Sequence, residues 1–205
     1  GKLLDWNYYP LDDYKHVHNT TSLEDLNAVL GINYKIFGFL NLNVKYRYEK
    51  QSSENHILYD QQSFYARDLI NGFSQIDENS GKITYVIPKG GILDLADNSI
   101  TAQNLRGQIN FDKSWGPHNV TILGGSEISE TIAHGNSYRL YGYDDNILTF
   151  ANVDYTRFYP NFATGNSNSI ASNLSLSKTN TRFASFFANA AYAYKNKYVF
   201  SISGR

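Results

Sequence analysis

The sequence predicts an all-β fold: an antiparallel meander of about six long strands that forms part of a large transmembrane β-barrel with long extracellular loops. Three observations predict it. Apolar and polar residues alternate with a period of two, short and long connections alternate between these segments, and aromatic residues gather beside the short connections. A membrane barrel combines these features, because its strands cross the hydrocarbon at a tilt and its turns are short on one side and long on the other.

The alternation is complete over residues 40–50. Leu40, Leu42, Val44, Tyr46 and Tyr48 fall on one face, and every residue between them is polar or charged. A helix would scatter these residues around its circumference, whereas a strand sorts them onto two faces. The same period, with occasional exceptions, predicts strands over residues 25–35, 40–50, 104–113, 119–130, 182–194 and 197–204.

The connections between these strands are of two kinds. Residues 36–39, 114–118 and 195–197 are tight hairpin connections, whereas the segments at about 51–101 and 131–181 are long and polar. Membrane barrels have short periplasmic turns and long outer loops. Loops of this length are uncommon in a compact soluble domain.

Aromatic residues flank all three tight connections: Tyr34, Phe37 and Phe39; Phe111 and Trp115; Tyr192, Tyr194 and Tyr198. Rings at one end of every hairpin are typical of an interfacial girdle. Alternation alone leaves open an antiparallel β-sandwich, which also has one dry and one wet face. Strand length, the alternating connections and the girdle together favour the barrel, since strands of soluble proteins are usually about five or six residues long.

Composition excludes several other classes. The 18 basic and 19 acidic residues give a formal net charge of -1, so there is no basic footprint for nucleic acid. No apolar run reaches the roughly 18 residues of a membrane helix. Without cysteine there is no disulfide framework and no thiolate metal site. The sequence has no methionine and no signal peptide, which leads us to expect a processed N-terminus or an internal segment of a longer protein.

Signatures of enzymes are missing. There is no G-x-S-x-G elbow, no P-loop and no H-E-x-x-H motif, so we expect a protein that is not an enzyme. The run from Gly124 to Glu127 (GGSE) falls in a predicted strand, where its glycines are better explained by bending or packing than by a nucleophile.

One group of residues in the second long connection is a candidate contact site. Aromatic rings with neighbouring polar groups suit a glycan or a peptide, because the rings supply apolar area and hydrogen bonds fix orientation. The alternative is that these side chains only order the loop against its own barrel or a partner protein. The group consists of Tyr138, Arg139, Tyr141, Tyr143, Asp144 and Asp145.

Two polar clusters could bind a metal ion, although each has a simpler explanation. Asp144 and Asp145, followed by Asn146, offer oxygen ligands to Ca²⁺ but could equally stabilise a turn. His16 and His18 would share one face of a strand and could ligate a transition metal, but a solvated loop explains the pair as well. We therefore predict no bound metal and no cofactor.

Five segments resemble the SusC/RagA family of TonB-linked outer-membrane proteins. They are spread over most of the chain in the order expected for a central stretch of that family's barrel: LGINYKIFGFLNLNVKYRYEKQ (30–51), SFYARDLINGFSQ (63–75), SYRLYGYDDN (137–146), LTFANVDY (148–155) and AAYAYKNKYVFSISGR (190–205). The resemblance implies that residues 1–205 are an internal part of a 22-stranded barrel in the bacterial cell outer membrane. The plug domain and the remaining strands would lie outside this chain.

The same resemblance implies a function. The parent protein would import a nutrient, an oligosaccharide or a peptide, past lipid and lipopolysaccharide. Energy would come from TonB acting through the plug, and a SusD-like surface lipoprotein would cover the outer loops. The polar residues Lys45, Arg47, Arg106 and Gln108 would face the lumen, where they line the passage or pack against the plug. The alternative functions are a soluble secreted β-sandwich for binding or adhesion, and a β-rich hydrolase that uses the loop carboxylates.

Overall fold

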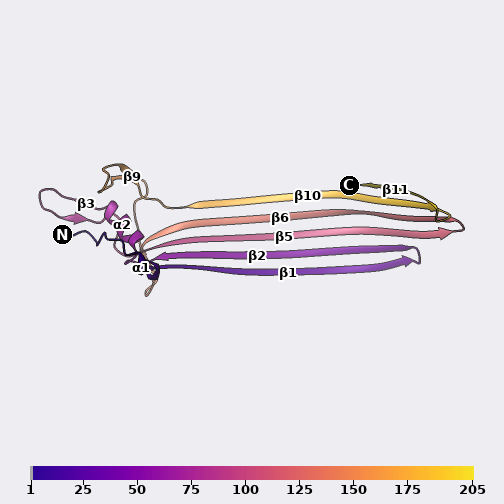
Figure 1. Cartoon of the computed structure of the whole chain (residues 1–205), viewed down its shortest axis with the longest axis horizontal. Coiled ribbons are helices and arrows are strands. Elements are labelled where there is room, and N and C mark those ends of the chain that lie inside the picture. Colours follow the sequence, from indigo (N-terminus) through magenta and orange to yellow (C-terminus); the bar gives the residue numbers. More distant parts are fainter. Residues whose placement is uncertain (1) are drawn as a thin grey trace. The chain divides into compact units, whose positions relative to one another are not determined.

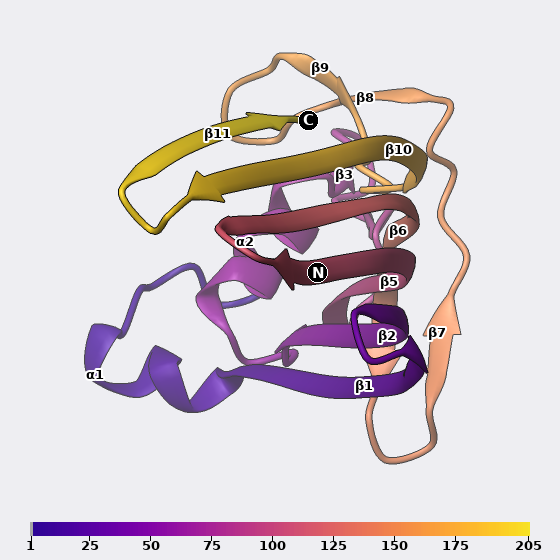
Figure 2. The same ribbon diagram turned by 90° about the vertical axis from the view of Figure 1, so that its right-hand side faces the viewer.

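The computed structural model describes residues 2–205, and within this range the long strands form one antiparallel sheet (Figure 1). The strand order follows the sequence, as in the predicted meander, and Figure 2 shows the strands stacked in this order. The strands are β1 (Val17–Phe37), β2 (Leu40–Tyr59), β5 (Gly91–Trp115), β6 (His118–Asp144), β10 (Ser175–Tyr194) and β11 (Tyr198–Gly204), with the short β7 (Thr149–Ala151) paired to β6.

The remaining elements are short and lie in the connections. Two two-stranded sheets are formed by β3 (Gln75–Ile76) with β4 (Ile83–Thr84), and by β8 (Phe158–Pro160) with β9 (Ser167–Ser169). The helices are α1 (Pro10–Asp13), the 3-10 turn η1 (Tyr14–His16) and α2 (Phe64–Gly72). None of the helices in residues 2–205 is long and apolar enough to cross a membrane.

Five of the six predicted strands lie inside observed strands that are much longer than predicted, and the sixth, predicted over residues 197–204, is observed as Tyr198–Gly204. The strands β1, β2, β5, β6 and β10 have 20 to 27 residues each. The two long connections shrink accordingly to residues 60–90 and 145–174. The three tight connections lie where the sequence places them.

By its internal contacts the chain forms two units, which we describe separately. The strand unit comprises Glu24–Ser52, Ser99–His134 and Lys178–Arg205, and the loop unit comprises the residues up to Leu23, Ser53–Asn98 and Gly135–Ser177.

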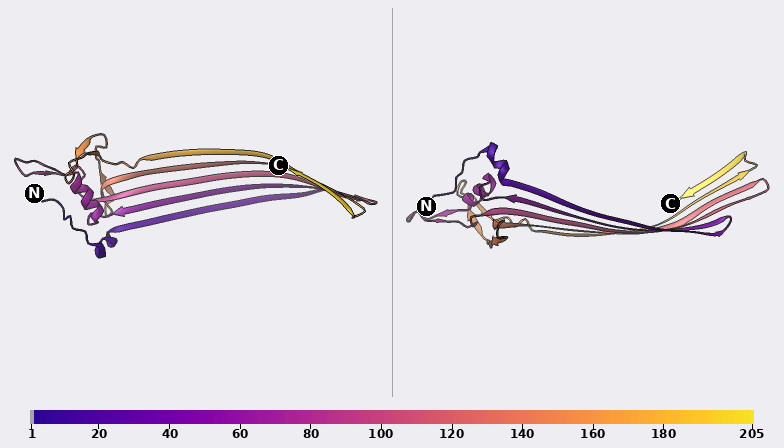
Figure 3. Two further views of the ribbon diagram at one scale, coloured as in Figure 1. Left: turned by 45° about the horizontal axis from the view of Figure 1, so that its top comes forward. Right: turned by 90° about the horizontal axis from the view of Figure 1, so that it is seen from below.

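The strand unit is a single layer of sheet (Figure 3). One of its faces carries apolar side chains that are exposed to solvent. Large side chains on this face are mostly exposed, such as Leu30 at 71% and Phe186 at 79%. The long strands all belong to one sheet, and the other two sheets among residues 2–205 have only two strands each. The β-sandwich alternative therefore does not describe the structure. Exposed apolar areas of this extent mark surfaces that meet a membrane or another protein.

The opposite, polar face of the strand unit carries a network of side-chain hydrogen bonds. Arg106 donates to Gln108 at 3.1 Å, and Gln108 donates to Asn110 at 2.7 Å. The Arg106 guanidinium also lies 4.5 Å from the centre of the Phe187 ring. Gly125 makes room for that ring, since a Cβ atom at Gly125 would lie 2.5 Å from Phe187 Cζ. The structure thus shows the packing role that the sequence predicts for this glycine.

The aromatic residues beside the tight connections form a cluster on the apolar face of the strand unit. The imidazole of His118 stacks with Trp115 at 6.3 Å and with Tyr192 at 5.9 Å between ring centroids, and its Nδ1 lies 2.7 Å from the Tyr192 hydroxyl. Phe39 packs edge-on against Phe111 at 5.6 Å. These rings have the amphipathic character of an interfacial girdle.

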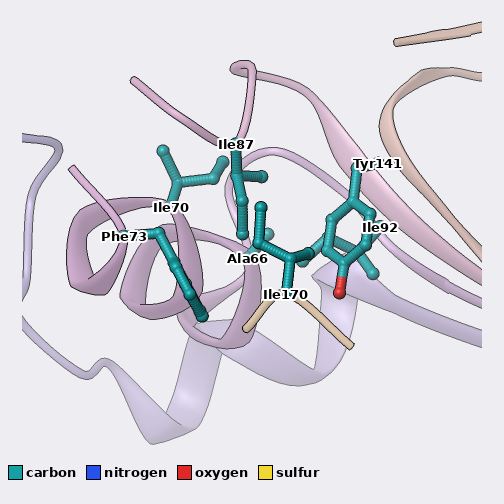
Figure 4. Close-up of a cluster of buried hydrophobic side chains, with 7 residues drawn as sticks. All are labelled: Ala66, Ile70, Phe73, Ile87, Ile92, Tyr141 and Ile170. Atoms are coloured by element: carbon teal, nitrogen blue, oxygen red, sulfur yellow. The ribbon is translucent and has the colours of Figure 1, made fainter. Parts of the chain in front are cut away.

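The loop unit has its own small hydrophobic core, built around helix α2 (Figure 4). Ser63 begins the helix by accepting a hydrogen bond from Ala66 N at 3.2 Å, which satisfies one of the free N–H groups of the first turn. Ala66, Ile70 and Phe73 follow at helical spacing, so that one side of the helix is apolar. Its partners in the core are Ile87, Ile92, Tyr141 and Ile170.

Candidate functional site

The candidate contact residues lie mainly in strand β6, and their expected placement in a long loop is wrong. Tyr138, Arg139, Tyr141 and Tyr143 belong to β6, Asp144 is its last residue, and only Asp145 lies in the following turn. The strand continues this far because β7 pairs with its end, Tyr141 opposite Ala151 and Asp144 opposite Thr149.

Arg139 is the centre of a polar network inside the loop unit. Its Nε donates to Asp94 Oδ1 at 2.6 Å and its Nη2 to Asp94 Oδ2 at 2.5 Å, the two-pronged geometry that suits a guanidinium and a carboxylate. Nη1 donates to the Tyr65 hydroxyl of α2 at 2.7 Å. Burial opposes the charge, but the Asp94 carboxylate outweighs it and raises the pKa of Arg139 above its usual value. The network therefore ties α2 to the strands β5 and β6.

Tyr141 is part of the same internal structure. Its ring is only 1% exposed, and its hydroxyl donates to the Ala171 carbonyl at 2.6 Å. Burial raises the pKa of Tyr141 to about 12, which keeps the hydroxyl protonated and able to donate. For Tyr141 and Arg139 the structure thus favours the alternative in which these side chains order the loop segments.

Tyr143, Asp144 and Asp145 line a polar cleft of about 440 Å³ in the loop unit. Gly142 turns the chain at this point with φ of +58°, and a Cβ atom at Gly90 would lie 2.6 Å from the Gly142 carbonyl carbon. A side chain at Gly90 would therefore push apart the two backbones that frame the cleft. Further hydrogen-bonding side chains come from other segments: Asp60, Gln61, Gln62, Lys89, Asn146 and Thr149.

These additional cleft residues could not be found from the sequence. They come from the segment after β2, the segment before β5, the turn after β6 and strand β7, which no motif connects. The cleft offers hydrogen-bond donors and acceptors but no apolar pocket. It therefore suits a ligand with many hydrogen-bonding groups, such as a peptide backbone or a sugar. Contact of Tyr143, Asp144 and Asp145 with such a ligand stays a prediction.

Neither polar cluster that could bind a metal is arranged for one. Asp144 Oδ1 accepts from Asn146 N at 2.9 Å, as the turn interpretation predicts. His16 lies in η1 rather than on a strand; its Nδ1 is 2.8 Å from Asp60 Oδ2 and its Nε2 is 3.6 Å from Asp12 Oδ2. Across the part of the chain that the structure describes, no group of three or more His, Asp or Glu is placed to hold a metal ion.

The four residues expected to face a lumen all lie on the polar face of the strand unit. Arg47 forms an ion pair with Glu49 at 2.6 Å, and Arg106 and Gln108 belong to the network described above. Lys45 packs its side chain near Gly31 on the neighbouring strand. The face they share is distinct from the exposed apolar face, because side chains of a strand alternate.

Comparison with known proteins identifies the fold. No protein-family model and no curated protein matches the sequence. Among solved structures, the RagAB peptide transporter matches with a TM-score of 0.64 and 13% identity over 92% of this chain. The RagAB peptide importer in the "closed-closed" state matches with a TM-score of 0.60 and 14% identity, also over 92%. The likeness is one of fold.

This chain spans 18% of the length of each of these RagAB chains. The predicted antiparallel meander is thus confirmed, and the fold is one that occurs in transporters.

Proposed function

We propose that this chain forms a stretch of the wall of a bacterial outer-membrane β-barrel importer of the SusC/RagA type. The observation that carries the proposal is the exposed apolar face of the strand unit, bordered by the aromatic cluster at the tight turns. A lipid-facing barrel wall needs this pairing of an apolar band and an aromatic girdle. The likeness of the fold to the RagAB chains supports it.

In this proposal the polar face of the strand unit is turned to the lumen of a 22-stranded barrel. Lys45, Arg47, Arg106 and Gln108 then line the passage or contact a plug. Transport makes and breaks no covalent bond in the cargo, so the chain needs neither a catalytic residue nor a cofactor. TonB would supply the energy through a plug domain.

The loop unit would carry the contacts to cargo and to a SusD-like surface lipoprotein. The cargo would be a peptide or an oligosaccharide, because the cleft at Tyr143, Asp144 and Asp145 offers many hydrogen-bonding groups. Tyr138, with 37% of its surface exposed, is available for contact as well. The well-ordered core around α2 would hold these residues in place.

Cysteine scanning of the full-length protein tests which face meets lipid. These 205 residues contain no cysteine, so each introduced cysteine is the single labelling site within them. Single cysteines at Ile109, Ile128 and Phe186 of the apolar face would carry a spin label, with Gln108 and Asn189 of the polar face as matched controls.

We expect the apolar-face labels to be accessible to oxygen, which partitions into hydrocarbon, and protected from a water-soluble nickel chelate. The polar-face labels should show the opposite preference. Outer-membrane fractionation and a shift in gel mobility on heating should accompany this result. Equal accessibility of both faces to the chelate, in a protein found free in solution, would overturn the proposal.

A further inference from the structure

A groove of about 600 Å³ lies on the apolar face of the strand unit. Part of its lining is apolar, with Leu105, Ile128 and Ala184. The polar side chains of the lining, which we call the polar rim, include Gln103, Glu130 and Arg182. The groove therefore joins an apolar channel to charged and hydrogen-bonding groups, as a lipid with a polar headgroup requires.

The polar rim lies one hydrocarbon thickness from the aromatic girdle. Trp115 is twelve residues from Gln103 along β5, and His118 is twelve residues from Glu130 along β6. In β10, Tyr194 is likewise twelve residues from Arg182. Twelve residues at about 3.3 Å each, tilted by roughly 45°, cover about 28 Å, which matches the apolar band of a membrane barrel.

The rim is charged although it lies on the face that carries the apolar band. An ion pair pointing into hydrocarbon would be costly, so its place is the headgroup layer, at the edge of the band. Arg182 Nε donates to Glu130 Oε1 at 2.7 Å, and Asn180 donates to the same oxygen at 3.1 Å. Glu130 thus orients the arginine through one nitrogen.

Arg182 keeps its remaining donors available. Its side chain is 76% exposed, and within residues 2–205 its Nη1 and Nη2 make no hydrogen bond. A guanidinium edge of this kind matches two oxygens of a phosphate. Lys178, four residues along the same strand, has the same side-chain direction and adds a second positive charge.

Across the groove from the arginine, on β5 and β2, lie groups that suit a sugar. The Tyr46 hydroxyl donates to Gln103 Oε1 at 2.9 Å, so a phenol and an amide lie side by side there. Aromatic rings with adjacent hydrogen-bonding groups bind sugar rings well. A phosphorylated sugar with acyl chains fits these features better than a glycerol phosphate does, because the glycerol phosphate has no ring to cover Tyr46.

We propose that this groove binds lipopolysaccharide of the outer leaflet, with a lipid A phosphate on Arg182, a glucosamine ring at Tyr46 and Gln103, and an acyl chain along Leu105, Ile128 and Ala184. This inference rests on the proposed function, because it requires the apolar face to meet the outer membrane. It assigns a specific lipid to one place on the barrel wall.

The test measures binding of purified lipid A to the full-length protein in detergent, by native mass spectrometry and by titration of a fluorescent lipid A. Arg182→Gln should weaken binding about tenfold, the loss expected for one charge-assisted phosphate contact. Arg182→Lys keeps the charge without the planar edge and should weaken binding less. Arg157→Gln, a loop arginine beside Tyr159, is the matched control and should leave binding unchanged.

Phosphatidylglycerol and dephosphorylated lipid A are the comparison ligands, and both should bind more weakly than lipid A. Equal binding of phosphatidylglycerol and lipid A, or equal affinity of the wild type and Arg182→Gln for lipid A, would overturn the inference. Gel mobility on heating and outer-membrane fractionation are recorded for every variant. If the protein shows the mobility shift and fractionates with the outer membrane, but Arg182→Gln binds lipid A as the wild type does, the lipid site alone is refuted. If the protein shows neither the mobility shift nor outer-membrane fractionation, the proposed function is refuted too.

Discussion

The ion pair between Arg139 and Asp94 gives the sharpest prediction about stability. Arg139 has only 9% of its side chain exposed and Asp94 has 22%, and two short hydrogen bonds join them. Asp94→Ala would leave the buried guanidinium without its carboxylate, with the Tyr65 hydroxyl as its main remaining acceptor. Removing one partner of a buried pair costs about 3–5 kcal/mol, and the partial exposure of Asp94 favours the lower end.

A loss of about 3 kcal/mol corresponds to roughly a 100-fold increase in the population of the opened loop unit. Hydrogen exchange of the amides in α2, measured on the full-length protein, reports this opening directly. We expect those amides to exchange about 100-fold faster in Asp94→Ala, while amides of the strand unit keep their rates. Asp97→Ala is the control. It also removes an aspartate of β5, but Asp97 accepts only one hydrogen bond, from Asn136 at 3.2 Å.

The double variant Arg139→Met/Asp94→Leu distinguishes two contributions to the loss of stability: removal of the ion pair itself and burial of an unpaired charge. Replacing both partners by apolar residues of similar volume is often neutral, so its exchange should be closer to wild type than that of Asp94→Ala. Unchanged exchange of α2 in Asp94→Ala would refute the reasoning, because the network would then not hold the helix.

Two further predictions concern His16 and Gly125. The hydrogen bond to Asp60 raises the pKa of His16 above 6.5, so its contribution to loop-unit stability should be full below about pH 6.5 and lost as pH rises through the raised value. Protection of the α2 amides from hydrogen exchange, measured at several pH values, tests this, and a pH profile that His16→Gln leaves unchanged would contradict it. Gly125→Ala should destabilise the strand unit by about 1–3 kcal/mol through its clash with the Gly107 carbonyl oxygen and Phe187, whereas Gly124→Ala, with open space around it, should not. Urea unfolding in detergent micelles, monitored by heat-dependent gel mobility, distinguishes the two variants. Equal urea midpoints for Gly125→Ala and Gly124→Ala would contradict the packing role.

The strands could be predicted from the sequence only where one face is apolar. Residues 40–50 alternate without exception, and the strand there is as expected. In β6, alternation fades after Glu130, since Thr131, His134 and Asn136 are polar or weakly apolar on both faces. The backbone hydrogen bonding of β6 nevertheless continues to Asp144. A period of two reports a difference between two environments, so it disappears where both faces of a strand meet polar surroundings.

Helix α2 and the polar cleft could not be predicted from the sequence, for different reasons. The helix has nine residues, about two and a half turns, which gives periodicity little room to show. Its one local signal was Ser63 three residues before Ala66, the start of an apolar stripe. The cleft is assembled from separate segments by the close approach of Gly90 and Gly142, a contact that no local pattern encodes.

The exposed apolar face has a consequence for how the protein is made. Leu30, Ile32, Phe186 and Phe200 would all be open to water in a newly synthesised wall segment that had folded early. Self-association of such chains rises with the square of their concentration, whereas insertion into a bilayer rises only in proportion to it. Under the proposed function, efficient biogenesis requires that free chains stay scarce and that this face is shielded from water until it meets the membrane.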